Sequence, residues 1–566
     1  MKKVSKKIFA LLLTAALLVG VLAGCGGDAG TPSGNPSQGG NPSQSGNPSG
    51  GGGDEGGRDV GGLKLPLTAE KQELTVWVVY SGAVVSDLNE IEGIKKMEEA
   101  TNVHINWVTV EQQEVNERYG ILLASDTLPD IIALNMAYPG GFDKGMADGV
   151  IHPDMDKLIR ENMPNYMSLL AANEQGRREA TTDDGRMIVA RTIVGTDKTV
   201  EAEGNYQGLA YRADILQDLG LDVPATVDEW HDALAAAKAN GADAAFTLDT
   251  AGGSYMSLAW GISMEGVATL IPLQLDGNKV VCGYTMDGFK GYLDTMRQWY
   301  SEGLINKNFT SFNYYLDTPG SNDINEGLLY SRVLSAFAGD NYVQYHMVTN
   351  PNVFLQAIPA PVLKAGDQSL QTFNYVVAKE GMYITSDCKN PELAAKWMDY
   401  LYTEEGQYLN WYGIEGVTYE LGDDGTPYFT DFVLNNPDGI PGREVLQKYA
   451  LGWGESWIGK QDISANLKFS AATATGPNHQ EEAVAVWSEP GKNIAYPSGV
   501  TLTDAEAKKI TSPATALLTM MQEYTVNYII GESVKPFEDY VKDLYSFGLQ
   551  DVVDVYQAAY DRYMAR

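Results

Sequence analysis

Residues 74–80 read LTVWVVY, a run of β-branched and aromatic side chains that indicates a buried β-strand. Two more strands are predicted downstream, over 104–108 (HINWV) and 131–134 (IIAL). Apolar residues recur at helical spacing from 91 to 97, and a second helical segment starts at 115. Alternating strands and helices in this order are typical of a parallel α/β sheet.

Polar and aromatic side chains follow two of these strands directly. Tyr80 and Ser81 come after the first strand, and Asn135 comes after the third. Open α/β sheets bind ligands at the carboxyl ends of their strands. These three residues are therefore candidates for ligand contact, with an ordinary turn role as the alternative.

Residues 1–24 have the features of a secretory signal peptide. Four lysines stand among the first seven residues, and the apolar run 8–22 is too short for a comfortable membrane span. The run closes on Leu-Ala-Gly-Cys at 22–25, which resembles the bacterial lipobox. That resemblance implies cleavage before Cys25 and acylation of Cys25, including palmitate, so that the chain is anchored at the outer face of the cell membrane. An ordinary signal followed by a chance cysteine is the alternative.

Residues 25–66 are dominated by Gly, Ser, Pro and Asn, with a loose repeat of Gly-Asn-Pro-Ser. Such a composition cannot bury enough apolar surface to fold. The sequence therefore predicts a flexible tether between the anchor and a folded body that begins near 67.

The charge of the chain restricts the class of ligand. The formal net charge is −34, and removal of the lysine-rich signal makes the mature chain more acidic still. Such a chain repels nucleic acid and anionic lipid surfaces, so a neutral solute fits better. The chain also has 32 Tyr and 10 Trp, whose flat amphipathic rings suit the faces of sugars.

Beyond Cys25, the chain has two cysteines, Cys282 and Cys388. The sequence leaves open whether they form a disulfide or stay as separate thiols. The five histidines are widely spread and show no metal-ligand spacing, so no metal and no cofactor are expected.

Several stretches carry a family resemblance. They include LPDII (128–132), YRAD (211–214), LGLDVPATVDEW (219–230) and NWYGIEGV (410–417). Together they resemble family 1 extracellular solute-binding proteins of ABC importers, the maltodextrin-binding type, and within it the large lipoprotein branch of Gram-positive bacteria. The segment 148–153 departs from the family pattern, because His-Pro replaces its usual ending. Part of the resemblance consists of residues that mark where helices begin or end, which indicate the fold and not the ligand. Thr226 and Glu229, for example, predict a helix capping box.

The resemblance implies an α/β fold of the two-lobe periplasmic-binding-protein class, type II. Each lobe would be a mixed, mainly parallel sheet flanked by helices, with a hinge between the lobes. Lobe 1 is expected to comprise 67–190 and 350–390. Lobe 2 is expected to comprise 191–349 and 391–566, with a family-specific insertion near 420–500.

The resemblance also implies a function, namely the capture of a small solute in the cleft between the lobes and its delivery to the ABC permease. The solute is expected to be an oligosaccharide. The protein is expected to be a monomer and not an enzyme. Family position adds Asp340 and Tyr342 to the candidate ligand residues. Aromatic side chains add Tyr255, Trp260, Trp411, Trp453 and Trp457, each with core packing as the alternative role.

Two other functions stay open at this point. A surface enzyme acting on glycans would need paired carboxylates, which the many acidic residues do not exclude. However, the sequence has no Gly-x-Ser-x-Gly elbow, Walker loop or dinucleotide fingerprint. A glycan-binding sensor or adhesin without transport is the third possibility.

Overall fold

The computed structural model describes residues 57–566 except 83, 135, 137, 196–206, 243–244, 249–251, 253, 265–268, 312–328, 335–354, 373–376, 455–457, 474–482, 484–485 and 488–491. The predicted signal peptide and most of the predicted tether lie outside these residues. So do four candidate ligand residues, Asn135, Asp340, Tyr342 and Trp457. None of the described helices is both long enough and apolar enough to cross a membrane.

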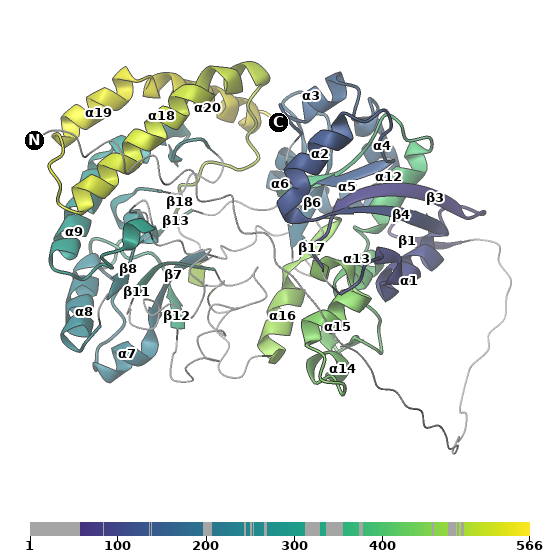
Figure 1. Ribbon diagram of the computed structural model, residues 1–566, viewed down its shortest axis with the longest axis horizontal. Helices are drawn as coiled ribbons and strands as arrows, with labels where there is room; N and C mark the ends of the chain where they lie inside the picture. Colours follow the sequence, from purple (N-terminus) through teal and green to yellow (C-terminus); the bar gives the residue numbers. More distant parts are fainter. Residues whose placement is uncertain are drawn as a thin grey trace, which may run out of the picture. The chain divides into compact units, whose positions relative to one another are not determined.

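The first hydrophobic core is built on a six-stranded mixed sheet (Figure 1). In spatial order its strands are β17 (Lys460–Asp462), β6 (Ala190–Gly195), β14 (Val377–Ile384), β5 (Ile131–Leu134), β3 (Gln72–Val79) and β4 (Val103–Val110). The three predicted strands are confirmed as β3, β4 and β5, and they pair in parallel as expected. Strand β14 runs antiparallel to both β5 and β6, whereas β17 runs parallel to β6. Strands β3, β5, β6 and β17 therefore all end at one edge of the sheet, called here the carboxyl edge.

Helices and a short hairpin complete the first core. The helices are α1 (Glu92–Thr101), α2 (Val115–Leu123), α3 (Phe142–Ala147), α4 (Met155–Asn162), α5 (Pro164–Ala171), α6 (Glu174–Ala180) and α12 (Pro391–Tyr400); the hairpin is β1 (Arg58–Val60) with β2 (Leu63–Leu65). Helix α12 contacts α4 and α5. Its buried Asp399 accepts hydrogen bonds from the backbone N–H groups of Asn165 (3.2 Å) and Tyr166 (2.9 Å), and it thereby caps the start of α5.

The second core surrounds a four-stranded sheet (Figure 1). Its strands, in spatial order, are β12 (Leu355–Ile358), β7 (Gln207–Arg212), β11 (Leu329–Leu334) and β8 (Phe246–Thr247). Its helices are α7 (Ala213–Asp218), α8 (Val227–Ala239), α9 (Asp287–Ser301), α18 (Asp504–Ile529), α19 (Phe537–Ser546) and α20 (Leu549–Met564). The predicted capping box of Thr226 and Glu229 is confirmed at the start of α8. The short pairs β9 (Leu273–Asp276) with β10 (Lys279–Cys282), and β13 (Leu370–Gln371) with β18 (Lys492–Asn493), also belong to this part.

A third, smaller hydrophobic cluster gathers elements between 404 and 473 and is called here the third cluster. It contains α13 (Glu404–Trp411), β15 (Tyr419–Leu421), β16 (Pro427–Phe429), α14 (Asp431–Leu434), α15 (Gly442–Tyr449), the 3₁₀ helix η6 (Leu451–Gly454) and α16 (Ile463–Thr473). Its position overlaps the segment near 420–500 that we expected to be an insertion.

The cores divide the chain differently from the lobe boundaries expected above. Helix α12 packs in the first core, although 391–566 was expected to belong wholly to the second lobe. Strand β12 joins β7 in the second sheet, although 350–390 was expected to return to the first lobe. The strand that returns to the first sheet is β14. A short apolar run such as 355–358 carries no signal for the sheet in which it pairs, which explains the difference.

Cys282 and Cys388 are free thiols, each buried in a different core. Burial raises the pKa of each thiol to about 12, so both stay protonated and poorly reactive at neutral pH. The question that the sequence left open is answered in favour of two separate thiols.

Candidate functional site

Tyr80 and Ser81 lie at the carboxyl edge, directly after β3, where the third cluster reaches the sheet. The backbone N–H of Tyr80 donates to the carbonyl of Val110 (3.0 Å), and that of Ser81 donates to the carbonyl of Gly454 (2.9 Å). A Cβ atom added at Gly454 would stand only 1.8 Å from Cε2 of Tyr80. The residue at 454 must therefore be glycine for the Tyr80 ring to lie against the end of η6.

Both side-chain hydroxyls at this point are buried without a hydrogen-bond partner among the described residues. The Tyr80 side chain is only 4% exposed, and burial raises its pKa to about 12. The phenol therefore stays protonated and able to donate at neutral pH. A buried polar group without a partner costs about 1–3 kcal/mol. Two such groups on consecutive residues at a carboxyl edge are suited to a ligand that brings its own donors and acceptors.

Trp411 and Trp453 lie behind this edge in the third cluster, where each is at most 4% exposed. Their rings meet edge to face at 6.4 Å, and Trp453 packs in the same way on Phe469 at 5.1 Å. Both indole N–H groups are used internally: Trp411 donates to the carbonyl of Lys460 (2.9 Å), and Trp453 donates to that of Trp411 (2.7 Å). Of the two roles left open for these residues, the structure favours packing. Through the bond to Lys460, Trp411 also connects the third cluster to β17 of the first sheet.

Tyr255 and Trp260 belong to the second core, on the 3₁₀ helix η3 (Tyr255–Trp260). Tyr255 is buried, and it borders a cavity of about 20 Å³ with Gly208, Ile358 and Trp487. Trp260 is half-buried and lies edge to face on Tyr292 of α9 at 5.6 Å. The described contacts therefore place these two residues in the second core, whereas Tyr80 belongs to the first.

The comparisons with known proteins identify the family. The model of the bacterial extracellular solute-binding protein family matches residues 89–408, more than half of the chain. The chain belongs to this family. A fructooligosaccharide ABC transporter substrate-binding protein of Streptococcus pneumoniae, FusA, is 25% identical over 535 residues, which are 89% of this chain and 93% of FusA. Lipoprotein LipO of Bacillus subtilis is 21% identical over 63% of this chain and 69% of LipO.

Solved structures support the fold. A crystal structure of an extracellular solute-binding protein from Bifidobacterium longum subsp. infantis superposes with a TM-score of 0.70 at 20% identity. It covers 87% of this chain and 98% of the other. S. pneumoniae FusA in complex with kestose superposes with a TM-score of 0.63 at 22% identity, covering 87% and 99%. The predicted type II two-lobe fold of this solute-binding protein is confirmed.

The structure adds polar residues at the carboxyl edge that the sequence did not indicate. Strand β17 ends there at the fully buried Asp462, which accepts hydrogen bonds from the backbone N–H of Ser464 (2.9 Å) and from Nε2 of Gln407 (3.1 Å). Oε1 of Gln461 and the side-chain amide of Asn410 are buried without partners among the described residues. The sequence KQD at 460–462 has no apolar alternation, so no strand was predicted there.

Apart from the Asp462 carboxylate, which accepts hydrogen bonds from Ser464 and Gln407, the side chains described above at this edge offer hydroxyls and amides. Among the residues that the structure describes, no group of three or more His, Cys, Asp or Glu side chains is arranged to hold a metal ion. Hydroxyl and amide groups both donate and accept hydrogen bonds, as the hydroxyls of a neutral polyol do. The described part of the edge therefore suits a neutral, hydroxyl-rich solute better than a charged one.

Proposed function

We propose that this solute-binding protein captures an oligosaccharide at the carboxyl edge and delivers it to the permease of an ABC importer. The observation that carries the proposal is the pair of buried, unpartnered hydroxyls of Tyr80 and Ser81, which lie where α/β sheets bind ligands. A sugar would supply both missing partners and relieve their desolvation cost.

Two further observations support the proposed class of solute. The strongly acidic chain disfavours polyanions, so a neutral ligand agrees with its charge. The relative FusA is named for fructooligosaccharides, and a solved structure with which this chain superposes is of FusA in complex with kestose. We therefore propose short fructose- or glucose-based oligosaccharides as the first solutes to test.

Replacing the two hydroxyls separates a binding role from a packing role. We expect Tyr80→Phe and Ser81→Ala each to weaken oligosaccharide affinity about 3- to 10-fold, the value of one neutral hydrogen bond. The same variants should leave the melting temperature of the free protein unchanged or slightly raised, because each removes a buried group that lacks a partner. Titration calorimetry and thermal unfolding measure the two quantities.

Tyr428→Phe is the matched control for Tyr80→Phe, since it removes the same hydroxyl from a side chain that is 53% exposed. It should change neither quantity. Unchanged affinity in both Tyr80→Phe and Ser81→Ala would refute this location for the site.

The anchor is also part of the proposal. Cys25 lies outside the described residues, and its support is the Leu-Ala-Gly-Cys motif at 22–25 together with LipO, which is named a lipoprotein. We expect Cys25→Ser to move most of the protein from the membrane fraction to the culture medium, because a polypeptide without acyl chains has no anchor. Immunoblotting of the two fractions measures this. Retention of Cys25→Ser at the membrane would contradict lipid anchoring at this residue.

The proposed carrier is a monomer that does no chemistry on its solute. The family is one of solute-binding proteins, and the relative FusA is named a substrate-binding protein of an ABC transporter, which supports a binding role without catalysis.

A further inference from the structure

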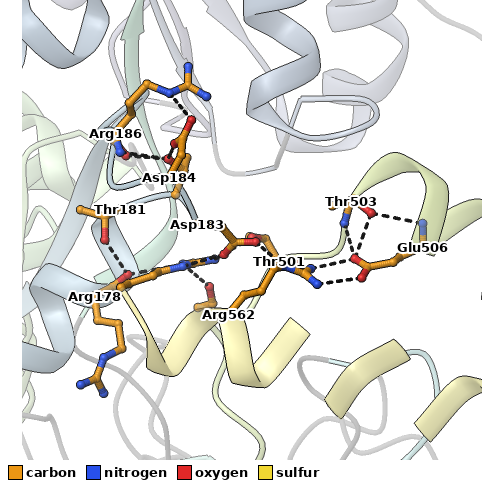
Figure 2. A network of polar contacts seen from close by, with 12 residues as sticks. Arg178, Thr181, Asp183, Asp184, Arg186, Thr501, Thr503, Glu506 and Arg562 are labelled. Carbon is orange, nitrogen blue, oxygen red and sulfur yellow. Dashed lines mark hydrogen bonds and ion pairs between the residues drawn. The ribbon is translucent and has the colours of Figure 1, made fainter. Parts of the chain in front are cut away.

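A compact set of ion pairs joins the last helix of the second core to a turn of the first core (Figure 2). The turn follows α6 and precedes β6, and it is closed by a hydrogen bond from the N–H of Gly185 to the carbonyl of Thr182 (2.9 Å). Asp183 stands on this turn. Its carboxylate faces two arginines, Arg562 on α20 and Arg566 just beyond it.

Arg562 connects three elements with one guanidinium group. Its Nε donates to Asp183 Oδ2 (2.7 Å), while Nη1 and Nη2 donate to the two carboxylate oxygens of Glu506 (2.8 Å each). Glu506 is itself fixed, because it forms the capping box of α18 with Thr503. Bidentate pairing of this kind holds the guanidinium in a single orientation.

Arg566 is the buried member of the set, with a side chain only 1% exposed. Nε and Nη2 donate to Asp183 Oδ1 (2.9 and 2.6 Å), and further donors reach the carbonyl of Gly499 (3.1 Å) and Oγ1 of Thr501 (2.8 Å). Because a buried charge is costly without its counter-ion, Asp183 is required to keep Arg566 in place.

The surroundings of these ion pairs are not close-packed. A cavity of about 780 Å³ lies beside them, lined by 140–148 and 179–191 from the first core and by 498–503, which packs on the second. Close contacts occur next to the ion pairs: a Cβ added at Gly499 would stand 2.5 Å from Cγ of Glu179, and the Arg178 guanidinium lies 5.6 Å from the centre of the Tyr563 ring. Such an arrangement holds two bodies at one point while leaving room for rotation about it.

We propose that Asp183, Glu506, Arg562 and Arg566 form an ion-pair clamp that acts as the pivot of the two lobes. The chain itself passes between the two cores in the connections from β6 to β7, from β13 to β14 and from α16 to β18. The clamp adds a non-covalent connection to these. In this role the clamp stays closed while the lobes reorient, and it limits the directions in which they move. The inference rests on the proposed two-lobe capture, but not on the identity of the solute.

The test compares two neighbouring aspartates on the same turn. Asp183→Asn removes the charge between the two cores. The matched control is Asp184→Asn, because Asp184 pairs with Arg186 (2.7 Å) inside the first core. Spin labels are placed at two exposed positions, Ile121→Cys on α2 and Tyr545→Cys on α19, in the full chain carrying Cys25→Ser. The native thiols Cys282 and Cys388 are buried and should not be labelled.

Double electron–electron resonance without solute is the readout, together with thermal unfolding. For Asp183→Asn we expect a broader distribution of distances than in the unsubstituted chain and separation of one unfolding transition into two, because the clamp no longer limits the directions in which the cores move. Asp184→Asn should resemble the unsubstituted chain in both measurements. Equal behaviour of the two variants would overturn the clamp.

If Asp183→Asn does not fold, Arg562→Gln takes its place, since Arg566 still pairs with Asp183 in that variant. The same broadening is then expected, and a distance distribution equal to that of the unsubstituted chain would again overturn the proposal. No solute is present in these measurements, so failure of the oligosaccharide proposal would not be mistaken for failure of the clamp.

Discussion

Trp453→Ala is expected to lower the free energy of unfolding by about 3–5 kcal/mol, the range for truncation of a large buried aromatic side chain. Trp453 is 3% exposed and lies between the rings of Trp411, Phe429 and Phe469. Its removal leaves a cavity that these rings can fill only in part. It also leaves the carbonyl of Trp411 without the indole donor that now lies at 2.7 Å.

Denaturant unfolding measures this effect, with Tyr428→Ala as the control. Tyr428 lies on β16, next to Phe429 of the third cluster, but its side chain is 53% exposed, so a change within about 0.5 kcal/mol is expected. Similar losses in the two variants would show that Trp453 is not a packing residue. In that case the stacking role that the sequence left open would have to be reconsidered.

Gly454→Ala is expected to reduce oligosaccharide affinity about 10-fold or more, because the added methyl group would overlap the ring of Tyr80. Either the ring or the end of η6 has to move. A moved ring displaces its hydroxyl, and a moved η6 breaks the hydrogen bond from Ser81 to the carbonyl of Gly454. A loss of stability of about 1–3 kcal/mol should accompany the loss of affinity, as for other overpacked positions.

Gly120→Ala is the matched control, because a Cβ at Gly120 meets nothing within 4 Å. Gly120 lies on the exposed side of α2, where alanine favours the helix by about 0.5–1 kcal/mol. This variant should bind as the unsubstituted chain does and be slightly more stable. Titration calorimetry measures the oligosaccharide affinity of both variants. Normal affinity in Gly454→Ala would mean that the Tyr80 ring does not form part of the site.

The elements that the sequence predicted well are those whose signal is local. The apolar run at 74–80 and the strand at 131–134 were predicted close to their observed bounds, because each is buried on both faces and flanked by polar turns. The capping box at Thr226 was equally local. Tyr80 and Ser81 became candidates because the residues that follow a parallel strand share one edge of the sheet.

The features that the sequence did not predict depend on partners far away in the chain. Strand β12 was assigned to the wrong sheet because its pairing with β7 spans more than 140 residues and leaves no trace in its own composition. The short polar strand β17 pairs with β6 through its backbone, and its own side chains carry no pattern that predicts a strand. The packing role of Trp411 and Trp453 depends on indole contacts that cross the third cluster, whereas the sequence left ligand contact and core packing both open for these residues.

We propose that the protein binds an oligosaccharide without altering it. Titration calorimetry of the Cys25→Ser chain against kestose, longer fructooligosaccharides and maltooligosaccharides, followed by chromatography of the recovered sugar, tests it directly. We expect saturable binding of one sugar per chain, with the sugar recovered intact. Recovery of shortened sugars would contradict it in favour of an enzyme, and absence of binding across all the neutral sugars would contradict the proposed class of solute.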